Sequence, residues 1–414
     1  MPPGRFLRQF RMRLLALLLI AVTVAGQSAL RVQVSHTTES LRGASVVTRD
    51  IAWVSGTHGT YLRTIDGGRT WTPAEVPGSD TLDFRAVVAF SAGEAFLMSS
   101  GTGDQSRIYH TSDAGQHWQL QFTNPNPKGF FDSMVFWDRR HGIVLGDPIP
   151  DESGKLKFEL LLTDDGQTWH PIPPSQLPPA FEGEGAFAAS NTCITILGSP
   201  SINLGAGMSG PSNGWKRGAS APRQPTKNDR ALAPEGPDSN IWFASGGTVA
   251  RVFHSPDRGQ TWQVIDTPII RGPDSAGIFS IAFRDALHGV IAGGDYKHPD
   301  DDGPNLAFTE DSGKTWTLSP IRPQAFFSAL AYARHVNEEV AREAMSPPNK
   351  KKTDPPSHRL FAVSQEFILD FRGPANPRRI SPKKKLAMKF NAASAYPEGG
   401  ALIVGPKGVI ATIR

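Results

Sequence analysis

Short apolar segments rich in small side chains recur along the chain, and a second apolar run follows each of them. Runs of this length are typical of buried β-strands rather than helices. The pairs therefore predict the first two strands of seven similar units. They are LRGASVV (from residue 41) with IAWVSG, FRAVVAF (84) with EAFLMSS, FDSMVFW (131) with HGIVLG, FAAS (187) with IWFASGG, FSIAF (279) with HGVIAGG, FSALAY (327) with RLFAVSQ, and FNAASAY (390) with GALIVG.

A turn motif of the form Ser/Thr-x-Asp-x-Gly-x-Thr-Trp follows five of these pairs, with departures only at Leu162 and His117. In such a turn the Asp side chain accepts hydrogen bonds from backbone amides, the Gly allows positive φ, and the Trp begins the returning strand. We therefore expect structural roles for the Asp and Trp of each copy. These are Asp66 and Trp71, Asp113 and Trp118, Asp164 and Trp169, Asp257 and Trp262, and Asp311 and Trp316.

One strand leads into each turn and another leaves it, so each unit of roughly 45 residues holds four short strands. Seven such units predict an all-β, seven-bladed β-propeller. The last unit stops after its third strand, GVIATIR, whereas LRVQVSHT near residue 30 is a strand without a blade of its own. We expect residues 30–37 to supply the outer strand of the last blade, which closes the ring and leaves no open sheet edge.

Two stretches interrupt the link between the first and second strands of a unit. Residues 199–239 are rich in Pro, Gly and Ser, and residues 334–357 combine a short helical pattern with a Pro- and Lys-rich tail. Neither has the hydrophobic period of a strand, so both are predicted to be inserted surface loops. The rest of residues 27–414 then forms one propeller domain.

The N-terminus has the pattern of a targeting segment. Four arginines precede the apolar run LLALLLIAVTVA, and small residues follow it near Ala25. The run is too short for a good membrane span. Residues 1–26 are therefore predicted to be a signal peptide, and the mature chain to be exported, as a periplasmic or secreted protein.

Composition and charge narrow the possible ligands. The net charge of +4 argues against nucleic acid as the main partner. The only cysteine, Cys193, lies in the apolar run TCITIL and is expected to be a packed, inert thiol. The sequence has no Gly-rich phosphate loop and no CxxC, and the run HPDDDG lacks the spacing of a calcium loop. We therefore expect no cofactor and no metal.

Units of the form LRGASVV…IAWVSGTHGTYLRTIDGGRTW resemble the photosystem II stability/assembly factor family of seven-bladed propellers. Their Asp-box turns, also called BNR repeats, are shared with sialidases and some glycoside hydrolases. The likeness covers the mature chain from about residue 30 onward. It implies the architecture and, as an expectation, a protein partner, possible membrane association of that partner, and a monomeric chain. A propeller is a fold with many functions, so the function must be argued from its site.

The predicted site lies at the mouth of the central channel, on the face opposite the Asp turns. Equivalent positions of the first strands should lie there at equal depth. Two adjacent arginines beside an aspartate would form a polar ring that can grip a carboxylate, so Arg42, Arg85 and Asp132 are binding candidates. The full set of second positions is Arg42, Arg85, Asp132, Ala188, Ser280, Ser328 and Asn391.

Two loops on the same face begin with Gly-Asp, at Asp147 and at Asp295. Ordinary turn chemistry explains either loop alone, but their place over the arginines adds both aspartates to the binding candidates. Two function classes remain open. The first is an exported, non-catalytic propeller that holds a protein or peptide at the channel mouth as an assembly scaffold. The alternative is a glycoside hydrolase or sialidase-like enzyme acting on carbohydrate there, with Asp147 and Asp295 as its carboxylates and Tyr296 as its tyrosine.

Overall fold

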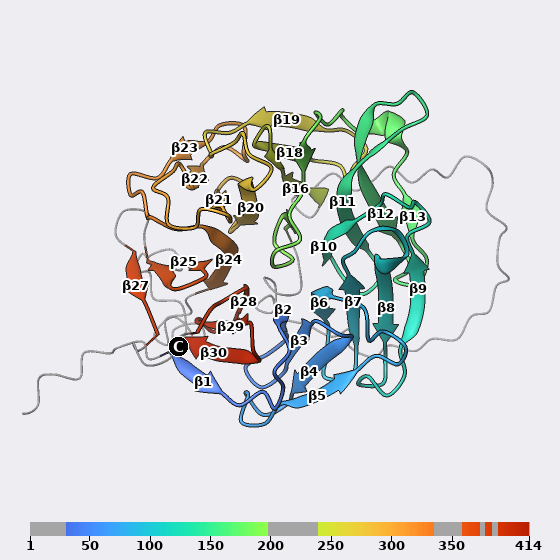
Figure 1. The fold of residues 1–414 in the computed structure, drawn as a ribbon, viewed down its shortest axis with the longest axis vertical. Coiled ribbons are helices and arrows are strands. Elements are labelled where there is room, and N and C mark those ends of the chain that lie inside the picture. The colour runs from blue at the N-terminus through green and yellow to red at the C-terminus, as the bar shows by residue number, and fades with distance from the viewer. Residues whose placement is uncertain (1–29, 198–238, 335–357, 373–376, 383–387, 414) are drawn as a thin grey trace, which may run out of the picture.

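In the computed structural model, seven antiparallel sheets are arranged in a ring around a central axis (Figure 1). Six of the sheets have four strands, and the sheet of the fifth blade has six because two short strands extend it. The structure describes residues 30–197, 239–334, 358–372, 377–382 and 388–413. The predicted seven-bladed propeller is confirmed. The predicted signal peptide lies outside the described residues, as do nearly all of the two predicted inserted loops.

The two inner strands of each blade are its most buried part, because small and apolar side chains there pack against both neighbouring blades. The strands nearest the axis are β2 (Leu41–Val46), β6 (Phe84–Ala89), β10 (Phe131–Phe136), β15 (Ile194–Ile196), β20 (Ala276–Phe283), β24 (Phe327–Arg334) and β28 (Ala392–Ala395). The second strands are β3 (Ala52–Gly56), β7 (Ala95–Ser99), β11 (Gly142–Pro150), β16 (Ile241–Ala244), β21 (Gly289–Asp295), β25 (His358–Ser364) and β29 (Ala401–Gly405).

The outer half of each blade is made by a third strand and a mostly exposed fourth strand. The third strands are β4 (Thr60–Thr64), β8 (Arg107–Thr111), β12 (Leu156–Thr163), β18 (Arg251–Ser255), β22 (Leu306–Thr309), β26 (Ile368–Phe371) and β30 (Val409–Ile413). The fourth strands are β5 (Thr72–Glu75), β9 (Gln119–Thr123), β13 (His170–Pro171), β19 (Gln263–Asp266), β23 (Thr317–Leu318), β27 (Arg378–Ile380) and, for the last blade, β1 (Arg31–Gln33). Two short 3₁₀ turns are η1 (Gly103–Gln105) and η2 (Pro174–Gln176).

The first strand of the chain closes the ring. β1 pairs antiparallel with β30, with Val32 opposite Ala411, and the two strands lie side by side near the C-terminus (Figure 1). A second contact joins β1 to the first blade: Trp71 Nε1 donates a hydrogen bond of 2.9 Å to Gln33 Oε1. β1 therefore completes blade seven and also fastens it to blade one.

Apolar clusters fill the spaces between successive blades. One combines Leu41 and Trp71 of blade one with Leu402 of blade seven, and six equivalent clusters lie between the other pairs of neighbours. The core of the molecule is therefore a ring of interfaces between sheets. No helix in the described part of the chain is both long and apolar enough to cross a membrane.

The Asp turns link the third and fourth strands, and their carboxylates bind the backbone of the turn. Asp257 is typical: Oδ1 accepts the Thr261 amide at 2.8 Å, and Oδ2 accepts the Thr261 hydroxyl at 2.6 Å. In the third copy the prediction of Asp164 was wrong. Asp165 takes the role there, accepting the Thr168 amide at 2.8 Å, because this turn is one residue shorter and begins at Thr163 rather than Leu162.

The prediction of FAAS as the first strand of the fourth blade was also wrong. That strand is β15, which lies further along the sequence and pairs with β16. The segment 186–192 instead crosses the channel. Two short strands belong to this arrangement: β14 (Glu184–Gly185) pairs with β17 (Gly246–Gly247), which extends the sheet of β20. The positions of β15, β16, β24 and β25 place both predicted insertions between first and second strands, as expected.

Candidate functional site

A cavity of about 380 Å³ occupies the channel mouth. Its lining includes the predicted binding residues Arg42, Arg85, Asp132 and Asp147, but not Asp295. It also includes six aromatic side chains, of which the sequence analysis selected only Tyr296. These are Phe130, Phe187, Phe279, Tyr296, Phe326 and Phe390.

A β-bulge near the start of the inner strands explains which side chains reach this cavity. The register between the first and second strands shifts at Arg42, Arg85 and Asp132 in blades one to three. It shifts at Phe279 and Ser328 in blades five and six. A bulged residue has no partner opposite it, so its side chain can be re-aimed. The blade-five member of the ring is therefore Phe279, and the prediction of Ser280 was wrong.

Ser280 has a different role, which shows how the blades are joined beneath the mouth. Its hydroxyl accepts the Leu330 amide of the next blade at 2.9 Å. Ser45 and Ser394 make similar bonds two residues deeper along their strands, accepting the amides of Ala89 and Val46, each at 3.0 Å. Hydroxyl groups below the mouth thus hold neighbouring inner strands together.

The two arginines share one carboxylate. Arg85 Nε lies 2.8 Å from Asp83 Oδ2, and Arg42 Nε lies 3.9 Å from the same oxygen. The guanidinium groups are about one-quarter exposed. Burial, and then the positive charge of Arg85, lower the pKa of Arg42 from its usual value. One negative charge between two positive ones leaves an excess of positive charge on this wall.

Arg85 is also fixed from the opposite side. Its Nη1 donates to the Ala188 carbonyl at 3.2 Å, and its guanidinium lies 5.9 Å from the ring centre of Phe130. The Nε of Arg42, in contrast, is buried without a hydrogen-bond partner, as is Oδ1 of Asp83. Buried polar groups are normally paired. The arginine wall therefore holds unused hydrogen-bonding capacity.

Two buried carboxyl groups face this wall from blade three. Asp132 is 1% exposed, and its Oδ2 has no hydrogen-bond partner. Burial, and then the negative charge of Asp147, raise the pKa of Asp132 well above its ordinary value. Burial raises the pKa of Asp147 to about 6, although its Oδ1 accepts the Ala186 amide at 2.9 Å. Burial thus shifts both carboxyl groups toward the neutral form, and Asp147 becomes mostly neutral below about pH 6, where repulsion toward an anion is reduced.

Asp295 belongs to its own turn rather than to the cavity wall. It is 6% exposed, its Oδ2 lies 2.9 Å from His298 Nδ1, and its Oδ1 accepts the Lys297 amide at 2.9 Å. Burial acts to raise its pKa, but hydrogen bonds from His298, Ser275 and Lys297 outweigh burial and hold it at about 2. The following residue, Tyr296, lines the cavity and is 44% exposed.

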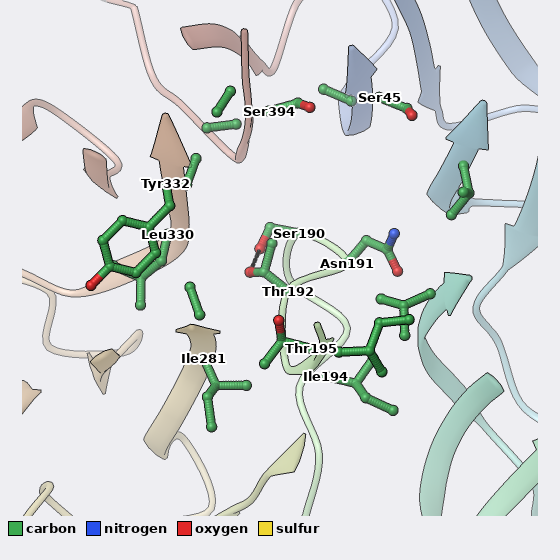
Figure 2. A pocket seen from close by; sticks show the side chains of 18 of the residues that line it. Ser45, Ser190, Asn191, Thr192, Ile194, Thr195, Ile281, Leu330, Tyr332 and Ser394 are labelled. Atoms are coloured by element: carbon green, nitrogen blue, oxygen red, sulfur yellow. Dashed lines mark hydrogen bonds between the residues drawn. The ribbon is translucent and has the colours of Figure 1, made fainter. Parts of the chain in front are cut away.

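The segment 186–192 forms the floor of the mouth. Ser190 donates to the Ser328 carbonyl at 2.6 Å, and Asn191 Oδ1 accepts the Met134 amide at 2.6 Å. The Ile281 amide donates to the Thr192 carbonyl at 2.8 Å. Figure 2 shows Ser190, Asn191 and Thr192 between the surrounding inner strands, and these residues line a second cavity of about 120 Å³. The segment therefore binds blades three, five and six and divides the channel into two compartments.

Neither compartment shows the chemistry of a metal site. Among the described residues, no group of three or more His, Cys, Asp or Glu side chains is placed to hold a metal ion. Cys193 is fully buried, and burial raises the pKa of its thiol far above the usual range. Its environment is that of an unreactive thiol.

For some of the cavity residues that the sequence analysis missed, the sequence contains a pattern that could have identified them. The doubled aromatics Phe130-Phe131 and Phe326-Phe327 stand at the start of two inner strands. The second ring of each pair is fully buried between blades, and the first lines the mouth. Asp83 lies two residues before Arg85, so alternation places both on one face. Phe187 had no such signal, because its segment was assigned to a strand.

Comparisons with known proteins agree on family and architecture. Residues 25–149 match the family model of the photosynthesis system II assembly factor Ycf48. The chain is 24% identical to the photosystem II assembly protein Ycf48 of Synechococcus sp. over 257 residues, which are 51% of this chain and 70% of that protein. It is 33% identical to the chloroplastic photosystem II stability/assembly factor HCF136 of Arabidopsis thaliana over 85 residues, which are 18% of this chain and 20% of that protein.

Solved structures share the fold at low sequence identity. Ycf48 from Cyanidioschyzon merolae has a TM-score of 0.52 at 16% identity, with 93% of this chain and 98% of that one covered. Virginiamycin B lyase from Staphylococcus aureus has a TM-score of 0.53 at 11% identity, with the same coverage of both chains. At these identities the likeness shows the fold alone. The same ring carries an assembly factor in one case and a lyase in the other, so the mouth must decide the function.

Proposed function

We propose that this seven-bladed propeller, which is similar to photosystem II stability/assembly factors, is an exported, non-catalytic assembly scaffold. Its task would be to hold an anionic peptide segment of a photosystem II subunit at the channel mouth. The observation that carries the proposal is the pair Arg42 and Arg85, which share the single carboxylate of Asp83 inside a cavity.

The chemistry of the cavity suits a carboxylate on an extended peptide. Arginine presents a planar fork of donors that matches a carboxylate, and such charge-assisted bonds are stronger than neutral ones. Arg42 makes no hydrogen bond through Nε, so its guanidinium can turn toward a ligand without breaking one there. A cavity of about 380 Å³ accommodates a few side chains rather than a folded domain. The ligand is therefore a short segment of the partner.

Capture of synthetic peptides tests the proposal. Peptides that cover the chain ends and exposed loops of photosystem II subunits would be titrated against the purified chain. We expect binding of one or more acidic peptides, and at least a tenfold loss in the double variant Arg42→Gln, Arg85→Gln. Arg139→Gln is the control, because Arg139 pairs with Glu94 away from the mouth. Equal binding by the double variant and the control would refute the arginine site.

Neutral substitutions are needed because both arginines are held by the surrounding structure. Each side chain is only about one-quarter exposed, and Arg85 bonds to Asp83 and to the Ala188 carbonyl. A glutamate at either position would face Asp83 directly and destabilise the fold. Glutamine removes the charge and keeps polar atoms in place. Melting temperatures within a few degrees of the wild type would show that the fold is retained.

Export is part of the proposal and has its own test. The arginines and apolar run of residues 1–26 support it. Fusion of these residues to a reporter enzyme that folds only outside the cytoplasm should give activity. Replacement of two leucines of the apolar run by arginine should abolish it. Equal activity of the two fusions would rule out export by this segment.

The hydrolase alternative now rests on Asp132 and Asp147 rather than on Asp147 and Asp295. A carboxyl group with a pKa of about 6 in a cavity has the property of a general acid, and this observation favours the alternative. Asp295 is held by its own turn and does not line the cavity. Turnover of aryl glycosides that is lost in Asp147→Asn but kept in Asp295→Asn would support the enzyme over the scaffold.

A further inference from the structure

The wall of the mouth opposite the arginines is aromatic. The rings of Phe187 and Phe279 stack with their centres 3.7 Å apart at 10°, and the ring of Phe326 meets Phe279 edge-on at 4.5 Å. Tyr296 packs edge-on against both Phe279 and Phe326, at 6.1 and 6.4 Å. These four rings form one continuous apolar surface, which we call the aromatic wall.

The aromatic wall comes from three separate parts of the chain. Phe279 is the bulge residue of β20, Phe326 precedes β24, and Phe187 belongs to the segment that crosses the channel. β20 lies across the ring from β6, which carries Arg85, and β24 is separated from β2, which carries Arg42, by blade seven (Figure 1). The cavity thus has a cationic side and an apolar side.

The backbone is adapted to hold Phe187 at this place. A Cβ atom at Gly246 would collide with the Phe187 ring, and one at Gly277 would lie 3.1 Å from it. Gly277 also has a φ of 148°, which favours glycine. Two glycines on adjacent strands therefore make room for the ring above the sheet. The position of the Phe187 ring is therefore fixed by these two strands as well as by its own loop.

The aromatic wall is open to the cavity rather than closed by packing. Tyr296 is among the exposed large side chains at 44% and Phe187 is partly exposed, although a buried position would be favoured for both. Aromatic side chains in a concave, partly charged site supply large contact areas at low entropic cost. An apolar group of a ligand would gain by covering them.

On the premise of the proposed function, we infer that the mouth recognises a carboxylate together with a neighbouring aromatic or large apolar side chain. The carboxylate binds Arg42 and Arg85, and the apolar side chain packs against Tyr296 and Phe187. The carboxylate can come from a chain terminus or from an acidic side chain. Both sources present the same chemistry to the arginines, and short probes can separate them.

Four small probes test this inference by NMR titration: N-acetyl-phenylalanine, N-acetyl-alanine, N-acetyl-phenylalanine amide, and the amide of N-acetyl-glutamyl-phenylalanine. The wild-type chain should bind N-acetyl-phenylalanine about tenfold or more tightly than N-acetyl-alanine. The probe without a carboxylate should bind weakest. Tighter binding of N-acetyl-phenylalanine assigns the site to a chain end, and tighter binding of the glutamyl probe assigns it to an acidic side chain. Either result supports the inference.

Variants connect the selectivity to the aromatic wall. Tyr296→Ala should bring the affinity ratio of N-acetyl-phenylalanine to N-acetyl-alanine close to one, whereas Leu120→Ala, at an exposed position on β9, should leave it unchanged. Arg42→Gln should weaken both probes equally. If binding depends on Arg42 but the ratio is already one in the wild type, the aromatic wall plays no part and the inference fails. If Arg42→Gln weakens neither probe, the proposed function fails instead.

Discussion

Single residues at the bulges give the mouth its chemical character. The same backbone irregularity recurs in five blades, yet it carries Arg42, Arg85, Asp132, Phe279 and Ser328 in turn. Because the bulged residue has no partner on the neighbouring strand, strand pairing does not restrict which side chain it carries. Substitution at these positions can therefore change the ligand while the propeller stays the same.

The buried carboxyl of Asp147 makes stability depend on pH. With its pKa raised from 3.8 to about 6, the folded chain holds this proton more tightly than the unfolded chain. The free energy of unfolding therefore falls as pH rises from about 4 to 6, and the loss persists at higher pH. Asp132 acts in the same direction.

We predict that Asp147→Asn removes the contribution of Asp147. Relative to the wild type, the variant should gain about 1–2 kcal/mol of unfolding free energy between pH 5 and pH 8. Urea unfolding at both pH values measures this difference. Parallel pH profiles for variant and wild type would show that Asp147 ionises normally in the folded chain.

Among structural elements, the Asp turn is the most regular. In all five copies one Asp binds both the amide and the side chain of the residue before the Trp. We predict that Asp257→Ala leaves these donors unpaired and lowers the free energy of unfolding by about 1–3 kcal/mol. Binding at the mouth should be unchanged in the folded fraction, since the turn lies on the opposite face. Loss of binding at an unchanged melting temperature would place the site on the turn face.

The shortened third turn offers a matched pair of neighbouring residues. Asp165 accepts the Gln167 and Thr168 amides, each at 2.8 Å, whereas no hydrogen bond is recorded for the exposed Asp164. Asp165→Ala should lower the melting temperature, and Asp164→Ala should leave it unchanged. The reverse order would mean that the turn keeps the longer form seen in the other four copies.

The segment across the channel depends on Asn191. Its φ of 63° is unusual for a residue with a side chain, and its Oδ1 accepts the Met134 amide and the Ser133 hydroxyl. Asn191→Ala should cost about 1–3 kcal/mol by leaving a buried amide unpaired. Asn191→Gly also removes the acceptor but tolerates the backbone angle, so it should cost less than Asn191→Ala. Equal costs, by chemical denaturation, would show that the backbone angle is not strained.

The sequence predicted elements better than it predicted the site. Apolar runs and Asp turns follow local chemistry, so seven blades and closure by residues near 30 could be inferred. The fourth inner strand could not, because FAAS and TCITIL both have strand character and only the three-dimensional ring decides between them. Phe279 and Asp83 were missed for a related reason. A bulge shifts the alternation by one residue, and the partner of a charged side chain depends on contacts that the pattern does not encode.

At the scale of the whole molecule, the same pair of hydrogen bonds joins neighbouring blades within the ring and at the place where the two ends of the chain meet. Gln121 on β9 accepts Trp169 Nε1 at 3.1 Å and donates to the Gly166 carbonyl at 3.0 Å. Gln33 on β1 does the same with Trp71 and Gly67, at 2.9 and 3.3 Å. In both places a glutamine of an outer strand therefore forms two hydrogen bonds with the Asp turn of the next blade.

This equivalence leads to a prediction about closure. Gln33→Ala and Gln121→Ala each remove the glutamine hydrogen bonds between two blades. Each should lower the free energy of unfolding by a similar amount, about 1–2 kcal/mol. Removal of residues 1–34 should cost more, because it also takes away β1 and exposes the edge of β30. An open edge can pair with another copy, so the truncated chain should self-associate at concentrations where a chain that begins at residue 27 does not. Light scattering and denaturation measure both effects. A truncated chain that stays as stable and as dispersed as the chain from residue 27 would mean that the ring is held closed by the apolar interface of blades one and seven alone.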